Sequence, residues 1–192
     1  MDETWLYHYD LETEQQSVEW QHSGSLHPKN FQVQKSAGKV LASIFWDQDV
    51  IFLTDYLPNG QTINAQYYLS LLVQLKDILK EKCRRKVITG VLFLHDNALV
   101  HQALATQKKL TYRGFQCLDH PPYSLDLAPS EYHLFPGLKK QLKGRHFSSN
   151  MEGTAAAETW LDGQLSENFL SGLQKLEQWV KKCIGLCGEY VE

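Results

Sequence analysis

Regular alternation of apolar and polar side chains in the first third of the chain predicts β-strands. Residues 1–10 alternate aromatic and polar groups, which is typical of a strand with one buried face. β-Branched and aromatic residues dominate positions 38–47 and 50–57, and the polar pair Gln48-Asp49 between these two runs predicts a hairpin. A shorter strand is predicted at residues 18–20.

The apolar residues change to helical spacing after Asn64. They recur every three or four positions over residues 64–81, which predicts an amphipathic helix with Asn64 as its N-cap. Residues 87–95 are then apolar almost throughout, as in a strand that is covered on both faces. The next elements expected are a helix at 98–112, ended near Gly114, and a short buried strand at 115–118.

Three helices are predicted in the last third of the chain. We expect them at residues 130–143, with an interruption near Pro136-Gly137, at 151–161 and at 167–186, with Ser149 and Ser166 as N-caps. Strands followed by helix, strand, helix and strand favour a mixed α/β sheet with a helical C-terminal tail. Because the sequence contains no internal repeat, low-complexity tract or long linker, we expect a single domain over residues 1–192.

The composition fits an intracellular globular protein. A chain of 192 residues, 43% of them hydrophobic, can bury a substantial core. No apolar run approaches the roughly 20 residues that span a bilayer, and Asp2 and Glu3 stand where a signal peptide would carry positive charge. The net charge of −3 argues against tight autonomous DNA binding. Basic runs at 82–86 and 139–146 would either contact phosphate or lie at solvated helix ends.

Cysteine and histidine raise the question of zinc. The four cysteines lack the dense spacing of a disulfide framework, so we expect free thiols at Cys83, Cys117, Cys183 and Cys187. Cys183 and Cys187 would share one helix face and offer half of a zinc site, but the sequence lacks the second pair that such a site needs. Four histidines could suggest a zinc cluster, but the acidic residues near them favour a polar scaffold. These histidines are His95, His101, His120 and His133.

Two acidic residues occupy positions where α/β proteins place functional groups. Asp96, in the motif LHDNA (94–98), ends a buried strand just before a helix, and side chains that leave strand C-termini converge at one edge of such a sheet. Glu131 follows a proline-bounded loop into the first turn of a helix, and proline holds such a loop in one shape. Each acid also has a structural alternative, Asp96 as a helix cap and Glu131 as the partner of a helix dipole.

These motifs resemble those of mariner-family DNA transposases. The similarity in order and spacing covers Asp2-Glu3-Thr4-Trp5 and the blocks 39–46, 95–101, 120–135 and 182–191, and so runs over nearly the whole chain. It implies a ribonuclease-H-like sheet that gathers acids from the first strand, the central strand and a later helix at one edge. By position in the motifs, these acids are Asp2, Asp96 and Glu131, with 34 residues between the last two, the interval that the family uses.

The resemblance also implies an activity. It is that of a nuclease and DNA strand transferase in which Asp2, Asp96 and Glu131 bind two Mg²⁺ or Mn²⁺ ions, with water or a DNA 3′-hydroxyl as the nucleophile. The implied partners are transposon-end and target DNA and a second subunit in a homodimer. The implied location is the nucleus, with no membrane contact. The alternative is an inactive or domesticated DNA- or protein-binding module that descends from a transposase.

Two departures from the mariner pattern bear on activity. Glu131 stands where the family typically has aspartate. Its extra methylene moves the carboxylate by about 1.5 Å, whereas catalytic constellations tolerate about 0.5 Å, so we predict weakened cleavage. In the family, two helix-turn-helix modules and half of the first strand precede the position of Asp2. We therefore expect an N-terminally truncated catalytic domain that lacks sequence-specific binding in the major groove.

Overall fold

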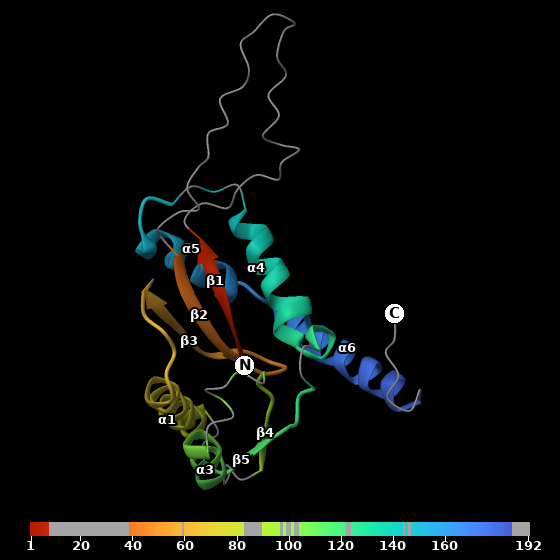
Figure 1. The fold of residues 1–192 in the computed structure, drawn as a ribbon. Helices are drawn as coiled ribbons and strands as arrows, with labels where there is room; N and C mark the ends of the chain where they lie inside the picture. The colour runs from red at the N-terminus through yellow and green to blue at the C-terminus, as the bar shows by residue number, and fades with distance from the viewer. Residues whose placement is uncertain are drawn as a thin grey trace, which may run out of the picture.

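The computed structural model (Figure 1) describes residues 1–7, 39–58, 60–82, 90–96, 98, 101, 104–121, 124–143, 145 and 147–185. Three strands form an antiparallel sheet in the order β1-β2-β3: β1 (Asp2–Tyr7), β2 (Lys39–Trp46) and β3 (Ile51–Pro58). Within the described residues, they confirm the three longer strands predicted for this part of the chain. The strand predicted at 18–20 lies outside the described residues.

The hairpin between β2 and β3 is confirmed. The Asp47 carboxylate accepts hydrogen bonds from the backbone N–H groups of Asp49 (2.8 Å) and Val50 (3.0 Å), an arrangement that stabilises a tight turn. On the other side of β2, the pairing with β1 places Asp2 opposite Ile44. The first residue of β1 therefore lies near the end of β2 that leads into this turn.

Two shorter strands form a parallel pair, β4 (Val91–Phe93) and β5 (Phe115–Cys117). Helix α3 (Leu104–Arg113) connects them and ends at Gly114, whose φ of 85° favours glycine. The prediction that β4 is covered on both faces is wrong, because Leu92 is 63% exposed. Phe93 and Phe115 pack into the core beside α1, whereas Leu92 points to the opposite face, since side chains alternate along a strand.

The two groups of strands meet at the start of the chain. The ammonium group of Met1 donates a hydrogen bond to the carbonyl oxygen of Leu94 (2.8 Å), one residue beyond β4. The N-terminus is accordingly drawn between β1 and β4 in Figure 1. This contact joins the antiparallel and the parallel strands, and it confirms the predicted mixed α/β architecture. It also brings the first residues of β1 to the edge where β4 ends.

Two helices begin directly after their predicted N-caps. α1 (Ala65–Lys82) follows Asn64, whose side chain accepts a hydrogen bond from the Tyr67 N–H (2.9 Å). α5 (Asn150–Asp162) follows Ser149, whose hydroxyl oxygen accepts from the Glu152 N–H (3.3 Å). The described residues also form α4 (Phe135–Leu142), α6 (Ser166–Gly185) and a short 3₁₀ helix, η1 (Leu125–Leu127). The prediction that Ser166 is the N-cap of α6 is wrong, because Ser166 is the first residue of the helix.

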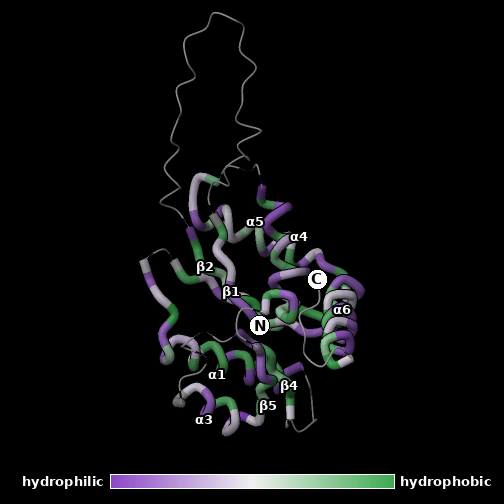
Figure 2. Tube along the Cα trace, turned by 45° about the vertical axis from the view of Figure 1, so that its right-hand side comes forward, coloured by the Kyte–Doolittle hydropathy of each residue, from purple (hydrophilic) through white to green (hydrophobic). Residues whose placement is uncertain are grey.

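Neighbouring residues of β2 face two different cores. Ile44 packs with Phe135 and Leu138 of α4 on one face, whereas Phe45 packs with residues of α1 and β4, Leu72 among them, on the other. The alternation of side chains along a strand produces this two-sided burial. Figure 2 shows hydrophobic and hydrophilic segments alternating along α1, as expected of a helix with one buried face.

The segment 130–143 differs from its prediction. Ser130–Leu134 form a π-helical turn, η2, which closes with a hydrogen bond from the Phe135 N–H to the Ser130 carbonyl oxygen and continues directly into α4. The interruption predicted near Pro136-Gly137 is therefore wrong, because the change of helix type falls earlier, after Leu134. Pro136 is tolerated because it lies in the first turn of α4, where proline fits the helical backbone.

The structure also bears on thiols and membrane contact. Cys117 and Cys183 are free thiols, as predicted, and the other two cysteines lie outside the described residues. Among the helices that the structure describes, none combines the length and the apolar character needed to cross a membrane.

Candidate active site

Asp2 lies at the first position of β1 with its side chain turned into the protein. It is 7% exposed and shares one face of the strand with Thr4 and Leu6, which are also buried. Its Oδ1 atom accepts a hydrogen bond from the Glu3 N–H (2.8 Å). The carboxylate is therefore held at the junction between β1 and β4.

Asp96 lies three residues beyond β4, at the edge where the sequence predicts functional groups. Its Oδ1 atom accepts a hydrogen bond from the Ala98 N–H (3.1 Å) and lies 2.6 Å from Nδ1 of His101. The hydrogen bond from the Ala98 N–H is of the capping kind that the sequence predicts as the structural alternative for Asp96. The side chain nevertheless remains 43% exposed, so this carboxylate caps a turn and is still accessible.

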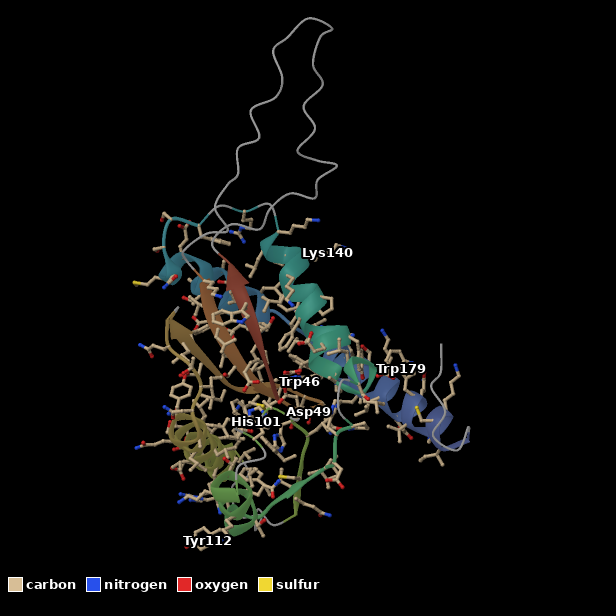
Figure 3. All side chains as sticks on the ribbon, in the orientation of Figure 1. Trp46, Asp49, His101, Tyr112, Lys140 and Trp179 are labelled. Carbon is tan, nitrogen blue, oxygen red and sulfur yellow. The ribbon has the colours of Figure 1, made fainter. Side chains whose placement is uncertain are left out.

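Glu131 lies in the π-helical turn η2, half-buried. Its N–H donates a hydrogen bond to the Ala128 carbonyl oxygen (2.9 Å). The residue before it, Ser130, is buried and accepts a hydrogen bond from the indole N–H of Trp46 (3.0 Å). Because Trp46 is the last residue of β2, this contact ties the turn that carries Glu131 to the sheet. Figure 3 shows Trp46 close to the point where β1 begins.

Asp2 and Asp96 line one cavity of about 490 Å³. Pro129 and Ser130 also line it, and Glu131 is the next residue in the chain. Apolar side chains from β2, β3, α1, β4, β5 and α6 form most of the remaining wall. The structure thus brings two of the three acids into a shared cavity and places the third beside its wall, close enough for its charge to act on Asp2.

The two acids of the cavity have pKa values shifted in opposite directions. Burial raises the pKa of Asp2 to about 7, and the nearby charges of Glu3 and Glu131 add to this effect. The hydrogen bond with His101 lowers the pKa of Asp96 below its usual range. A buried carboxylate with other carboxylates around it is an environment that a divalent cation would stabilise. Carboxylate oxygens are also the ligands that Mg²⁺ and Mn²⁺ prefer, so the donor set fits these ions.

Glu3 also belongs to this region, although the sequence pattern did not identify it as a candidate site residue. His101 is 1% exposed and lies between two carboxylates, with Nδ1 against Asp96 and Nε2 3.3 Å from Oε1 of Glu3. Burial alone would lower the pKa of His101, but the contacts with Asp96 and Glu3 outweigh it and raise the pKa to about 9. The sequence contains one signal for the pair Glu3 and His101. Glu3 belongs to the same motif as Asp2, and His101 belongs to the same motif as Asp96.

The histidines do not gather into a zinc cluster among the residues that the structure describes. In that part of the chain, the one group of three metal-ligating side chains is Glu3, Asp96 and His101. His133 lies elsewhere, with Nε2 2.8 Å from the carbonyl oxygen of Asn168 in α6. Burial and the neighbouring His101 lower the pKa of His95 to about 4, so that ring is neutral at physiological pH. These observations favour the polar scaffold.

Helix α6 packs closely against the turn that carries Glu131. The Tyr132 hydroxyl donates a hydrogen bond to the Gly172 carbonyl oxygen (2.7 Å), and the ring of Tyr132 contacts that of Trp179 with 5.0 Å between centroids. A Cβ atom on Gly172 would lie 2.7 Å from Cδ2 of His133. Glycine at this position therefore lets α6 approach η2, and π-helical turns of this kind are frequent at functional sites.

Replacing Gly172 with alanine is expected to destabilise the protein by about 1–2 kcal/mol, because the clash with His133 outweighs the better helix propensity of alanine. The melting temperature should fall by roughly 3–6 °C. Gly185→Ala is the matched control, since a Cβ there meets nothing within 4 Å. A melting temperature that is equal in the two variants would show that the packing of α6 on η2 does not depend on Gly172.

The sequence of the chain is similar to a transposase family model and to two curated proteins. Residues 10–89 match the family model "Transposase (partial DDE domain)". The Mariner Mos1 transposase of Drosophila mauritiana is 33% identical over 156 residues, which cover 80% of this chain and 45% of that protein. The Histone-lysine N-methyltransferase SETMAR of Homo sapiens is 29% identical over 196 residues, which cover 100% of this chain and 28% of that protein.

The fold is also similar to solved structures. The crystal structure of the catalytic domain of Mos1 mariner transposase superimposes with a TM-score of 0.72 at 32% identity, covering 80% of this chain and 76% of that one. The crystal structure of the Mos1 mariner paired end complex with Mn superimposes with a TM-score of 0.82 at 30% identity, covering 100% of this chain and 55% of that one.

These similarities define the class as a ribonuclease-H-like transposase catalytic domain, which confirms the predicted fold. The chain belongs to the mariner family of DNA transposases, as its motifs indicate. It spans less than half of the length of the two curated relatives described above, 45% of one and 28% of the other.

Proposed function

We propose that this chain is the catalytic domain of a DNA transposase that cleaves phosphodiester bonds with divalent metal ions held by Asp2, Asp96 and Glu131. The observation that carries the proposal is the shared cavity of Asp2 and Asp96, with Glu131 beside its wall. The three residues come from β1, the end of β4 and η2. Asp2 and Asp96 lie near each other because the Met1 ammonium joins the start of β1 to the residue after β4.

The chemistry of the donors supports this assignment. Divalent ions bound there would stabilise the negative charge that develops on the attacking and leaving oxygens of a phosphodiester. The protein would supply positioning: Asp96 through its contacts with Ala98 and His101, and Asp2 through its burial and its contact with the Glu3 N–H. The apolar wall of the cavity would limit water around these acids, which strengthens electrostatic interactions.

DNA is the proposed substrate and partner. Mos1 has been crystallised as a paired end complex with Mn and as a strand transfer complex, and we extend DNA binding to this chain. Lys139 and Lys140 are exposed at the end of α4 and could contact phosphate; Figure 3 shows Lys140 on the outer side of this helix. Action on chromosomal DNA would place the protein in the nucleus, and pairing of two DNA ends would suit a homodimer.

Conversion of supercoiled plasmid to nicked circles tests the proposal. We expect nicking in Mg²⁺ or Mn²⁺ and none in EDTA, accompanied by a rise in melting temperature on adding Mn²⁺, because a ligand that binds the folded state stabilises it. A protein that binds Mn²⁺ and DNA without nicking would favour the binding-module alternative. A protein whose melting temperature does not respond to Mn²⁺ would overturn the proposed metal site.

Shortening the third acid provides a sharper test. The family pattern has aspartate at position 131, so Glu131→Asp is expected to raise the rate of Mn²⁺-dependent nicking by about tenfold, because a misplacement near 1 Å can cost about a hundredfold in rate. The melting temperature without metal should change little, since Glu131 is half-buried. A rate that is unchanged or lower would mean that η2 already presents glutamate correctly.

A further inference from the structure

A buried histidine bridges the first strand and the proposed metal-binding edge. The ring of His101 is 1% exposed. Its Nδ1 atom lies 2.6 Å from Oδ1 of Asp96, and its Nε2 atom lies 3.3 Å from Oε1 of Glu3. Glu3 points to the opposite face of β1 from Asp2, since neighbouring residues of a strand alternate. Glu3, His101 and Asp96 therefore form a chain of contacts in that order. Asp96 lines the cavity, whereas Glu3 and His101 are not among the residues that line it.

The ring of His101 is held in one orientation. It packs on the ring of Tyr68, with 4.3 Å between centroids, and against the edge of His95, with 4.9 Å between centroids. The N–H of His101 donates a hydrogen bond to the Ala98 carbonyl oxygen (2.9 Å), which fixes the backbone beneath the ring. A side chain confined in this way can impose its geometry on a neighbour.

The hydrogen bonds that the described residues make with the Asp96 carboxylate fall on one of its two oxygens. Oδ1 accepts the hydrogen bond from the Ala98 N–H (3.1 Å) and the one from His101 Nδ1 (2.6 Å). Within the described residues, Oδ2 is thus the oxygen left available to a ligand, on a side chain that is 43% exposed. His101 and Ala98 together determine which oxygen of Asp96 is presented and in which direction.

The short distance between His101 and Asp96 fits a hydrogen bond better than two ligands of one metal ion. Glu3, Asp96 and His101 each offer a ligand atom within 4.8 Å of the others. Two adjacent ligands on one Mg²⁺ ion, at about 2.1 Å each in octahedral geometry, would be about 3 Å apart. The 2.6 Å separation between His101 Nδ1 and Asp96 Oδ1 is shorter than this and is typical of a charge-assisted hydrogen bond.

We propose that Glu3 and His101 are positioning residues that orient the Asp96 carboxylate for metal binding, with His101 in contact with Asp96 and Glu3 holding the far side of the ring. The inference rests on the proposed function, because it assumes that Asp96 is a metal ligand. Hydrogen-bonded partners of metal ligands change metal affinity or activity by about 10–100-fold when they are removed. The effect of these two residues should therefore appear in the affinity for Mn²⁺.

Two substitutions of His101 separate a positioning role from a packing role. In His101→Asn, the side-chain amide nitrogen takes the place of Nδ1 and keeps the hydrogen bond to Asp96. In His101→Leu, apolar packing on Tyr68 is kept and the hydrogen bond is lost. We expect the apparent Kd for Mn²⁺, from melting-temperature titrations, to rise about tenfold in the asparagine variant, which loses only the contact with Glu3, and about 100-fold in the leucine variant, which loses both contacts.

Glu3→Gln keeps the inference testable if the leucine variant fails to fold. It should raise the apparent Kd for Mn²⁺ about tenfold, whereas Glu158→Gln, at an exposed position of α5, should leave it unchanged. Equal Kd values in wild type and Glu3→Gln, or in the leucine and asparagine variants of His101, would overturn the positioning role alone. Absence of any Mn²⁺ response in the wild-type protein would instead overturn the proposed metal site, and this inference with it.

Discussion

Asp96→Asn is expected to lower metal-dependent plasmid nicking by at least a hundredfold. The amide keeps the size of the side chain, and its oxygen can still accept from the Ala98 N–H, so the turn after β4 should persist. What the change removes is the negative charge that would bind a divalent ion. Loss of about 3 kcal/mol of transition-state stabilisation corresponds to roughly a hundredfold in rate. Initial nicking rates at saturating Mn²⁺ measure the effect.

Asp77→Asn is the matched control for this substitution. Asp77 lies on α1 with a side chain that is 60% exposed and paired with Lys80, and a surface ion pair of this kind contributes little to stability. Its nicking rate should equal that of the wild-type protein. If Asp96→Asn retained the rate of this control, Asp96 would not be a metal ligand in the reaction, and the proposed site would have to be abandoned.

Local elements of this fold could be predicted because their signals are local. Gln48-Asp49 marks the turn between two strands. Asn64 and Ser149 are N-caps, whose side-chain oxygens accept hydrogen bonds from N–H groups in the first turn of the helix that follows. Each of these interactions joins residues that are two or three positions apart. The sequence contains both partners within one short window, so pattern and structure agree.

The π-helical turn η2 could not be predicted in the same way. Its hydrogen bond, from the Phe135 N–H to the Ser130 carbonyl oxygen, leaves the apolar spacing of the segment close to that of an ordinary helix. What holds the turn comes from elsewhere in the chain: Trp46 bonds to Ser130, and Tyr132 bonds to Gly172 of α6. Pro136 was the local feature on which the predicted interruption of the helix was based. The change from π-helix to α-helix lies two residues earlier, after Leu134.

Glu3 was missed for a related reason. Alternation along β1 indicates only that Glu3 faces away from Asp2, and nothing near it in the sequence identifies its partner. That partner, His101, lies 98 positions further on and contacts Glu3 in the region where the Met1 ammonium joins β1 to the end of β4. The acids Asp2, Asp96 and Glu131 came from resemblance to a family, whereas their support depends on tertiary contacts of this chain.

The raised pKa of Asp2 predicts how stability depends on pH without metal. In the unfolded chain its pKa is near 3.8, and in the folded protein it is about 7, so between these values the folded state binds more protons. Stability contributed by this group is therefore present at low pH, falls as pH rises from about 4 to about 7, and is absent above. Around Asp2, the hydrogen bond from the Glu3 N–H and the Met1 ammonium lower its pKa and oppose this effect, while the charges of the Glu3 and Glu131 side chains raise the pKa and strengthen it.

Asp2→Asn should therefore stabilise the metal-free protein and abolish its response to metal. At pH 8 the variant is expected to melt a few degrees above wild type, because the amide carries no charge to bury; at pH 4.5 the difference should nearly vanish. Adding Mn²⁺ at about 100 times its Kd should stabilise wild type by about 2.7 kcal/mol and the variant hardly at all. Asp55→Asn separates the two effects, because burial also raises the pKa of Asp55 but its place on β3 leaves it outside the cavity that Asp2 and Asp96 line. That control should gain slight stability at pH 8 and keep the full response to Mn²⁺, whereas an undiminished response in Asp2→Asn would show that metal binds without β1.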